Sequence, residues 1–171
     1  VNTGQLADVD GKFDVITMFH VMEHIPDPVK TFKKLYDLLN QGGSLFIEVP
    51  NIESFSQSPG NTFFKAHIHY FSVATLIACA SQYFVSADLD NSGNNIRILF
   101  NRRASIKEFE LPTKVDIEAS KTLVTQKTWF NYVFKGKAYL KALNRVRVVI
   151  QDARLVKIEP RAILDAIISK Q

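Results

Sequence analysis

The sequence predicts an α/β fold that is followed by a helical C-terminal extension. Three observations support this prediction: an apolar run over residues 13–19, a helical pattern that begins at Pro28, and a second apolar run over residues 44–49. A strand, a helix and a strand at this spacing form a right-handed crossover unit, so both strands should lie parallel in one sheet. Hydrophobic residues make up 46% of the 171-residue chain, which suffices to bury one core.

The first strand should be central and buried. Residues 13–19 include Val15, Ile16 and Thr17, with Gly11 before them and a polar turn after them. A short apolar run bounded by turn residues is typical of a parallel strand that is covered on both faces.

The next helix is expected to begin at Pro28, because proline is favoured in the first turn of a helix. Apolar residues then recur at spacings of three and four, at Phe32, Leu35, Leu38 and Leu39. Gly42 and Gly43 are expected to end this helix, and residues 44–49 should form the next strand.

A long polar and aromatic loop is expected over residues 51–70, and its length indicates a function beyond connection. Ser72 is the predicted N-cap of a helix that runs to about residue 82. Residues 85–89 and 96–101 should then form two strands, because the turn-rich sequence DNSGNN between them predicts a hairpin.

Beyond Arg103 the pattern becomes helical. One apolar series contains Ala119, Leu123, Phe130 and Phe134, and a second contains Leu140, Leu143, Val146 and Ile150. Gly136 separates the two series, and Pro160 should introduce a short last helix over residues 161–169. A basic stripe of Lys137, Lys141 and Arg145, spaced four apart, is expected either to contact phosphate or to form a solvated face.

The distribution of charge divides the chain into two parts. Residues up to Ile96 contain five Lys/Arg and ten Asp/Glu, whereas the residues from Arg97 onward contain sixteen and seven. We therefore expect a first unit over residues 1–103 and a basic helical extension over 104–171, which either faces an anionic partner or presents a solvated surface. No nucleic-acid motif and no membrane span are predicted, and the single Cys79 fits a reducing cytoplasm.

Three segments in register resemble one enzyme family. They are FDVITMFHVMEHIPDP at residues 13–28, PVKTFKKLYDLLNQGGSLFIEVPN at 28–51 and AHIHYFSVATL at 66–76. Together they resemble the later half of class I S-adenosylmethionine-dependent methyltransferases, and in particular the group that acts on small molecules, quinones and sugars. The resemblance implies a partial Rossmann-like sheet that contains the later strands, with the last one antiparallel. It also implies methyl transfer to a small-molecule or sugar-type acceptor.

The resemblance further implies where the cofactor S-adenosylmethionine would bind. Phe19, His20 and Val21 would border its methionine part at the carboxyl end of the first strand, where ligands bind in open parallel sheets. The segment Gly4, Gln5 and Leu6 resembles the loop that contacts adenine. Gln5 stands where the family often has an acid, and its side-chain carbonyl can still accept a hydrogen bond from an amino group.

Two family features have no counterpart in the sequence, the glycine-rich nucleotide loop and the acid that binds ribose. Gly42 and Gly43 follow a predicted helix, which is the wrong context for such a loop. We therefore expect this chain to be a truncated domain that lacks the N-terminal cofactor-binding half. The alternative is a non-catalytic partial fold that serves as a binding or assembly module. In either case the strand at 13–19 would be an open edge, covered by a second copy of the chain or by the C-terminal helices.

Methyl transfer requires an aligned acceptor and, for many acceptors, removal of a proton. His24, His67 and His69 are the candidate bases, because imidazole titrates near neutral pH. His24 could instead order its turn with Glu23, and either His67 or His69 could be a polar anchor beneath the next helix. In an extended segment His67 and His69 should point to one side, opposite Ile68 and Tyr70. The H-x-H spacing also suits zinc or iron, but no third ligand is specified nearby, so no metal is predicted.

Overall fold

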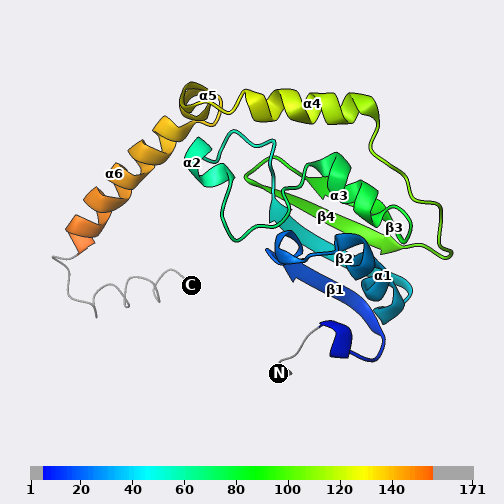
Figure 1. The fold of residues 1–171 in the computed structure, drawn as a ribbon. Helices are drawn as coiled ribbons and strands as arrows, with labels where there is room; N and C mark the ends of the chain where they lie inside the picture. Colours follow the sequence, from blue (N-terminus) through cyan, green and yellow to red (C-terminus); the bar gives the residue numbers. More distant parts are fainter. Residues whose placement is uncertain (1–5, 156–171) are drawn as a thin grey trace.

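The computed structural model describes residues 6–155, and Figure 1 shows a mixed four-stranded sheet with helices packed on it. The strand order is β1-β2-β4-β3. The strands are β1 (Phe13–Phe19), β2 (Leu39–Pro50), β3 (Phe84–Asp90) and β4 (Asn95–Arg102). β1 and β2 are parallel, whereas β4 lies antiparallel between β2 and β3. The predicted α/β fold, with its antiparallel last strand, is confirmed.

The helices follow the expected order. They are the short 3-10 helices η1 (Leu6–Asp8) and η2 (Met22–His24), and α1 (Pro28–Leu38), α2 (Pro59–Thr62), α3 (Val73–Ala80), α4 (Lys114–Thr125), α5 (Trp129–Phe134) and α6 (Ala138–Leu155). The side chain of Asp27 caps α1 by accepting a hydrogen bond from the Lys30 amide, and Pro28 occupies the first turn. Ser72 caps α3 in a capping box with Thr75.

The core lies between the sheet and the helices α1 and α3. Its fully buried side chains include Phe32 and Leu35 from α1, Leu76 from α3, and Leu45, Ile47, Ile98 and Phe100 from the two central strands. Alternate residues of β2 and β4 point into this core, as expected for strands with one covered face. This packed core holds α1, α3 and the sheet in place, and with them the carboxyl end of β1, where the site lies.

The predicted role of Gly42 and Gly43 is wrong, because α1 ends at Leu38 and β2 begins at the next residue. The β1–β2 register jumps from the pair Phe13 and Leu39 to the pair Val15 and Ser44, so the glycines lie in an irregularity within the strand. Gly42 has a φ of +77°, which a residue with a side chain rarely adopts. The glycine pair therefore lets the extra residues of β2 loop out of the ladder.

The basic extension is attached to the long loop that follows β2. Ser120 on α4 donates a hydrogen bond to the Glu53 carboxylate, and Lys141 on α6 donates to the carbonyl oxygen of Ser56. Gly136, between α5 and α6, lies so close to Phe55 that a Cβ atom there would be 2.1 Å from the Phe55 carbonyl oxygen. The predicted helix over 161–169 lies outside the described residues.

β1 forms one edge of the sheet, as far as residues 6–155 show. Val15 and Phe19 are 60% and 55% exposed on it. Figure 1 shows α4 to α6 on the side of the sheet away from β1, so these helices do not cover the edge. Within the same residues, no helix has the length and apolar character needed to cross a membrane.

Candidate functional site

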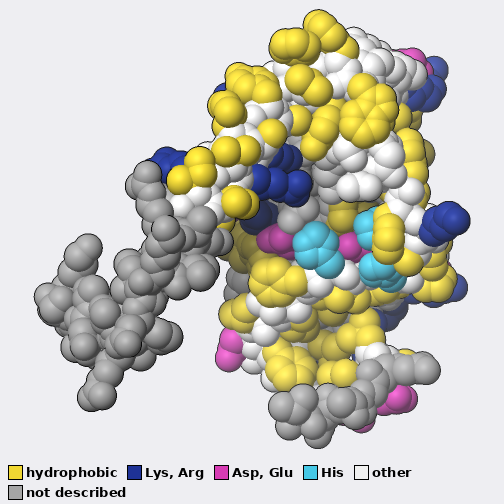
Figure 2. Space-filling view, turned by 90° about the vertical axis from the view of Figure 1, so that its left-hand side faces the viewer, with side chains coloured by type: hydrophobic (Ala, Val, Ile, Leu, Met, Phe, Trp, Pro, Cys, Tyr) yellow, Lys and Arg dark blue, Asp and Glu magenta, His cyan; other side chains and the backbone are white. Residues whose placement is uncertain are grey.

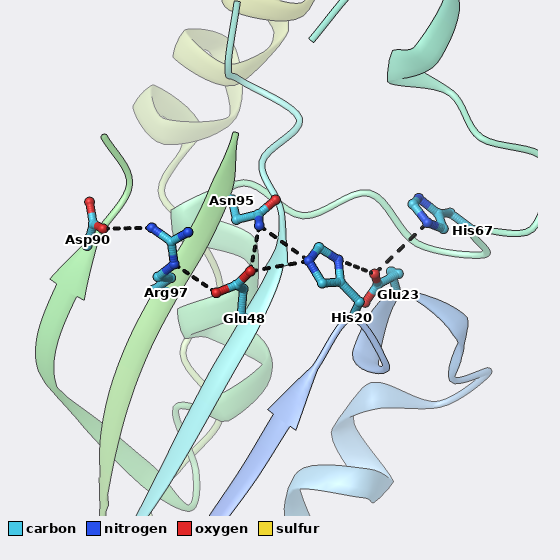
Figure 3. Close-up of polar contacts among 7 residues, drawn as sticks. All are labelled: His20, Glu23, Glu48, His67, Asp90, Asn95 and Arg97. Carbon is cyan, nitrogen blue, oxygen red and sulfur yellow. Dashed lines mark hydrogen bonds and ion pairs between the residues drawn. The ribbon is translucent and has the colours of Figure 1, made fainter. Parts of the chain in front are cut away.

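The carboxyl end of β1 lies in a chain of polar contacts that crosses the sheet (Figure 3). His20 follows the last residue of β1 and has a φ of +52°. Its backbone amide donates to the Glu48 carbonyl oxygen at 2.9 Å. Its imidazole lies between two carboxylates, with Nε2 at 3.2 Å from Glu48 Oε1 and Nδ1 at 3.3 Å from Glu23 Oε1. A non-glycine residue with positive φ is uncommon and is frequent at functional sites.

Glu48 is held by side chains from the neighbouring antiparallel strand. It accepts hydrogen bonds from Arg97 Nε at 2.7 Å and from Asn95 Nδ2 at 2.6 Å. These contacts, above all the one with Arg97, lower the pKa of the Glu48 carboxyl and keep it ionised. Glu48 is therefore a fixed negative charge beside His20.

Glu23, on η2, is the most enclosed charged side chain of the site, at 1% exposure. Among the described residues, no group donates a hydrogen bond to either carboxylate oxygen. His20 Nδ1 lies within ion-pair distance of Oε1 but is not aligned for a hydrogen bond, and His67 Nε2 is 4.0 Å away. A buried carboxylate without hydrogen bonds is unusual, because desolvation disfavours its charge.

His24 and His67 lie beside Glu23, with their rings edge to face and their centroids 4.9 Å apart. His24 Nδ1 donates to the Ala66 carbonyl oxygen at 2.9 Å, so Nε2 keeps its lone pair. Burial lowers the pKa of His67, although the nearby Glu23 carboxylate acts in the opposite direction. The lone pair on His24 Nε2 and the inward-facing His67 ring are thus available to a ligand beside Glu23.

The loop that carries His67 is tied to η2 through the backbone. The amides of Ile68 and His69 both donate to the Glu23 carbonyl oxygen, at 2.9 and 3.1 Å. His67 points inward and Ile68 is 56% exposed, as the predicted alternation requires, but the Tyr70 ring lies 6.0 Å from the His67 ring, so these two side chains do not take opposite sides as predicted. His69 reaches the Pro26 carbonyl oxygen at 3.3 Å and does not join the Glu23 cluster.

The residues expected to border the cofactor occupy two places. Phe19, His20 and Val21 follow one another at the carboxyl end of β1, and Figure 2 shows the histidine side chains gathered on this face around acidic ones. Leu6 packs instead against the core and lines a hollow with Val15. Gly4 and Gln5 lie outside the described residues.

A cavity of about 310 Å³ lies between the N-terminal part of α3 and the helix α4. Its lining is mainly apolar and includes Ile52, Tyr70, Ile117 and Val124. Tyr70 connects the cavity with the imidazoles, because its ring centroid is 6.0 Å from that of His67. The C-terminal extension therefore forms one wall of a cavity next to the histidines.

Sequence reasoning missed Glu48, Asn95 and Arg97 as members of the site. A signal was present, because Glu48 is the one acid in the apolar run over residues 45–49. The sequence did not reveal that Arg97 is the partner of Glu48, because the two residues meet only through the register of β2 with β4. Glu23 was expected to order its turn, but its carboxylate accepts no hydrogen bond within the described residues and faces the imidazoles. Its backbone carbonyl instead accepts from the amides of Ile68 and His69 in the loop after β2.

Comparisons with known proteins identify the segment that contains this site. Residues 2–83 match the family model described as a methyltransferase domain. The chain is 41% identical over 69 residues to a tRNA U34 carboxymethyltransferase of Campylobacter fetus, a match that covers 39% of this chain and 24% of that protein. It is 36% identical over 45 residues to a ubiquinone biosynthesis O-methyltransferase of Azotobacter vinelandii, covering 26% and 19%. The chain thus spans about a quarter or less of the curated relatives it matches.

One similar solved structure is a putative S-adenosylmethionine-dependent methyltransferase from Listeria monocytogenes. Its TM-score is 0.46 at 12% identity, and the match covers 58% of this chain and 67% of that one. The family match spans β1, α1, β2 and α3, which are the elements that position Glu23 and the histidines. Over these elements, which make up a little under half of the chain, the sequence is similar to the methyltransferase domain family.

Proposed function

We propose that the protein transfers a methyl group from S-adenosylmethionine to a small-molecule or sugar-type acceptor at the carboxyl end of β1. The observation that supports this most is the imidazole cluster beside Phe19, His20 and Val21, within the segment that matches the family. Exposed Phe19 and Val21 would contact the methionine part of the cofactor. Their exposure leaves room for a ligand against the end of the strand.

The apolar cavity between α3 and α4 is the proposed acceptor site. Its volume suits a small molecule, and Tyr70 places it next to His67. Methyl transfer from a sulfonium needs the acceptor atom in line with the methyl carbon and the sulfur, so this cavity would contribute mainly by orientation. We assign the C-terminal extension the role of shaping access to this cavity.

The acceptor's proton would be removed at the imidazole cluster. His24 and His67 suit this role better than His69, because they lie next to the Glu23 carboxylate, and the His67 side chain is only 16% exposed. A carboxylate beside an imidazole stabilises the imidazolium that forms on proton transfer. His69 points to a backbone carbonyl and would anchor the loop.

The glycine-rich loop that the sequence lacks would come from residues upstream in a longer chain. This is the basis for proposing that the 171 residues alone bind the cofactor weakly. The alternative, a non-catalytic partial fold used as a binding or assembly module, predicts no cofactor binding in either form.

Calorimetric titration with S-adenosylhomocysteine tests the proposal, using this chain and the same chain extended upstream in its reading frame. We expect binding to the extended form, and Phe19→Ala should weaken it by at least tenfold, or about 1.4 kcal/mol. Phe63→Ala is the matched control, because Phe63 is exposed to a similar degree, 57% against 55%, and lies in the loop after β2. Absence of binding to both forms would overturn methyl transfer in favour of the non-catalytic module.

A methyl-transfer assay with the extended form would then identify the class of acceptor. The Campylobacter relative is named for tRNA and the Azotobacter relative for ubiquinone biosynthesis, so the assay should compare tRNA with phenolic and sugar hydroxyls. We expect the small hydroxyl compounds to be methylated, because the cavity beside Tyr70 is mainly apolar and has a volume of about 310 Å³. Methylation of tRNA alone would contradict the proposed acceptor.

A further inference from the structure

Three side chains near the carboxyl end of β1 present metal-binding atoms to one another. One carboxylate oxygen of Glu23 and one ring nitrogen each of His24 and His67 lie within 4.8 Å of one another. We propose that these residues form a binding site for a divalent transition-metal ion. This goes beyond methyl transfer, because the ion can be bound and measured without cofactor or acceptor.

The first argument is the state of the Glu23 carboxylate. It is 1% exposed, and neither oxygen accepts a hydrogen bond from any group in residues 6–155. Buried charges in proteins are normally paired or coordinate metals, because an uncompensated charge is strongly disfavoured in a low-dielectric interior. His20 Nδ1 lies 3.3 Å from Oε1 without forming a hydrogen bond, and a divalent cation beside Oε1 would supply direct compensation of the charge.

The second argument is the orientation of the two imidazoles. His24 Nδ1 donates to the Ala66 carbonyl oxygen, which fixes the tautomer and leaves a lone pair on Nε2. Metal-binding histidines usually make this second hydrogen bond, because it orients the ring and raises the basicity of the ligating nitrogen. His67 directs Nε2 toward Glu23, at 4.0 Å from Oε1.

The third argument is the fit of the distances. Zinc binds histidine nitrogen and carboxylate oxygen at about 2.0–2.2 Å, so two ligand atoms at a tetrahedral ion are roughly 3.4 Å apart. The 4.0 Å between Glu23 Oε1 and His67 Nε2 must therefore shorten by roughly half an ångström, and the pairs that involve His24, which lie within 4.8 Å, by at most roughly 1.4 Å, so the side chains must rotate toward the ion. The loop can follow, because His67 lies outside the helices and strands.

The ligand set also selects the ion. Two imidazoles and one carboxylate suit zinc, cobalt, manganese or iron, whereas magnesium prefers oxygen ligands and water. Three protein ligands leave one tetrahedral position for water or for an acceptor oxygen. An ion there would lower the pKa of a bound hydroxyl, and His24 and His67 would then hold the ion instead of taking the proton. This last consequence rests on the proposed function, whereas metal binding itself does not.

Titration of the metal-free chain with Co²⁺, followed by visible d–d absorption, tests the site directly. We expect saturable binding of one ion, displaced by Zn²⁺ but not by Mg²⁺. Glu23→Gln and His67→Asn should each weaken binding by at least tenfold, as loss of a ligand does. His69→Asn is the matched control, because His69 lies in the same H-x-H segment but outside the cluster, and it should bind as the wild type does.

Absence of saturable Co²⁺ binding to the wild-type chain would overturn the proposal, even if a variant failed to fold. Equal losses in His67→Asn and His69→Asn would also overturn it, since binding would then not depend on the Glu23 cluster. Titration with S-adenosylhomocysteine separates this result from the proposed function. Metal binding without cofactor binding would overturn only the proposed methyl transfer. Cofactor binding without metal binding would overturn only the proposed metal site.

Discussion

Arg97 on β4 donates a hydrogen bond from Nε to Oε2 of Glu48 on β2 at 2.7 Å, and the two residues are direct partners in the strand register. The same guanidinium donates to Asp90 on β3 at 3.0 Å. Hydrogen bonds from Ser92, and then from Arg97, lower the pKa of Asp90 to about 2. One arginine thus connects three strands of the sheet.

Replacing Arg97 with glutamine should lower stability at neutral pH and have little effect in acid. A carboxyl whose folded pKa lies below its unfolded value stabilises the fold above the unfolded pKa, and this stabilisation is lost as the pH falls through the folded pKa. For Asp90 this window runs from 3.8 down to about 2, and for Glu48 it begins near 4.5. The difference in denaturation midpoint between wild type and variant should therefore shrink below pH 4.5.

Arg103→Gln is the matched control for this experiment. Arg103 Nε donates to the carbonyl oxygens of Ser81 and Phe84, which do not titrate. Its loss should cost stability equally at both ends of the pH range. A pH-independent difference for Arg97→Gln as well would show that its carboxylate contacts contribute nothing.

Replacing Glu23 with glutamine should stabilise the metal-free protein. The buried carboxylate has no hydrogen-bond donor among residues 6–155, so a neutral amide removes a desolvated charge. We expect the free energy of unfolding to rise by about 1–3 kcal/mol in the presence of a chelator, measured by urea denaturation. Adding Zn²⁺ should reverse the order, because only the wild type would gain from binding.

The control for this prediction is Glu118→Gln on α4, where the side chain is 70% exposed and pairs with Lys121. This change should leave the denaturation midpoint nearly unchanged in either condition. A loss of stability in Glu23→Gln with the chelator present would mean that the carboxylate already has a stabilising partner.

Gly136→Ala should loosen the C-terminal extension from the loop after β2. The added Cβ would lie 2.1 Å from the Phe55 carbonyl oxygen and 2.6 Å from that of Tyr132, so backbone must move. We expect faster hydrogen exchange over α4 and α5 and a loss of at least ~1 kcal/mol in their local stability. Gly60→Ala in the same loop is the control, because a Cβ there meets no atom within 4 Å. Equal exchange in both variants would mean that the close approach at Phe55 does not hold the extension.

Val15→Lys should reduce self-association through the open edge of β1. Val15 is 60% exposed, and a lysine on an edge strand opposes pairing with another strand. Sedimentation velocity should show the wild type shifting to larger species with concentration, and the variant remaining smaller. Val115→Lys on α4, where the residue is 77% exposed, should behave as the wild type. A wild type that stays monomeric at all concentrations would contradict the prediction.

Local pattern was sufficient to predict most of the fold. The β-branched run at residues 13–19, Pro28 and Ser72 each act within a few residues, and the structure places a strand, a helix start and a capping box there. Gly42 misled because glycine serves both to end helices and to let strands bulge, and only the β1–β2 register distinguishes the two uses.

The site was less predictable, because its contacts join distant segments. The burial of His67 next to exposed Ile68 was predictable from extended geometry, whereas the approach of the Tyr70 ring to the His67 ring was not. The meeting of His67 with Glu23 depends on the path of the loop over residues 51–70, which no local spacing encodes. The pairing of Glu48 with Arg97 likewise required the antiparallel insertion of β4 beside β2.

The Glu23 carbonyl oxygen accepts hydrogen bonds from two successive amides, those of Ile68 and His69, and so joins the loop after β2 to η2 next to the buried carboxylate. A ligand that reaches the Glu23 carboxylate must therefore either pass beside these two intact hydrogen bonds or bind only after they open. The hydrogen-exchange rates of the Ile68 and His69 amides therefore measure how often this part of the site opens. Slow exchange in the ligand-free protein would mean that the loop stays closed while a ligand binds, and that His67 is already in position before binding.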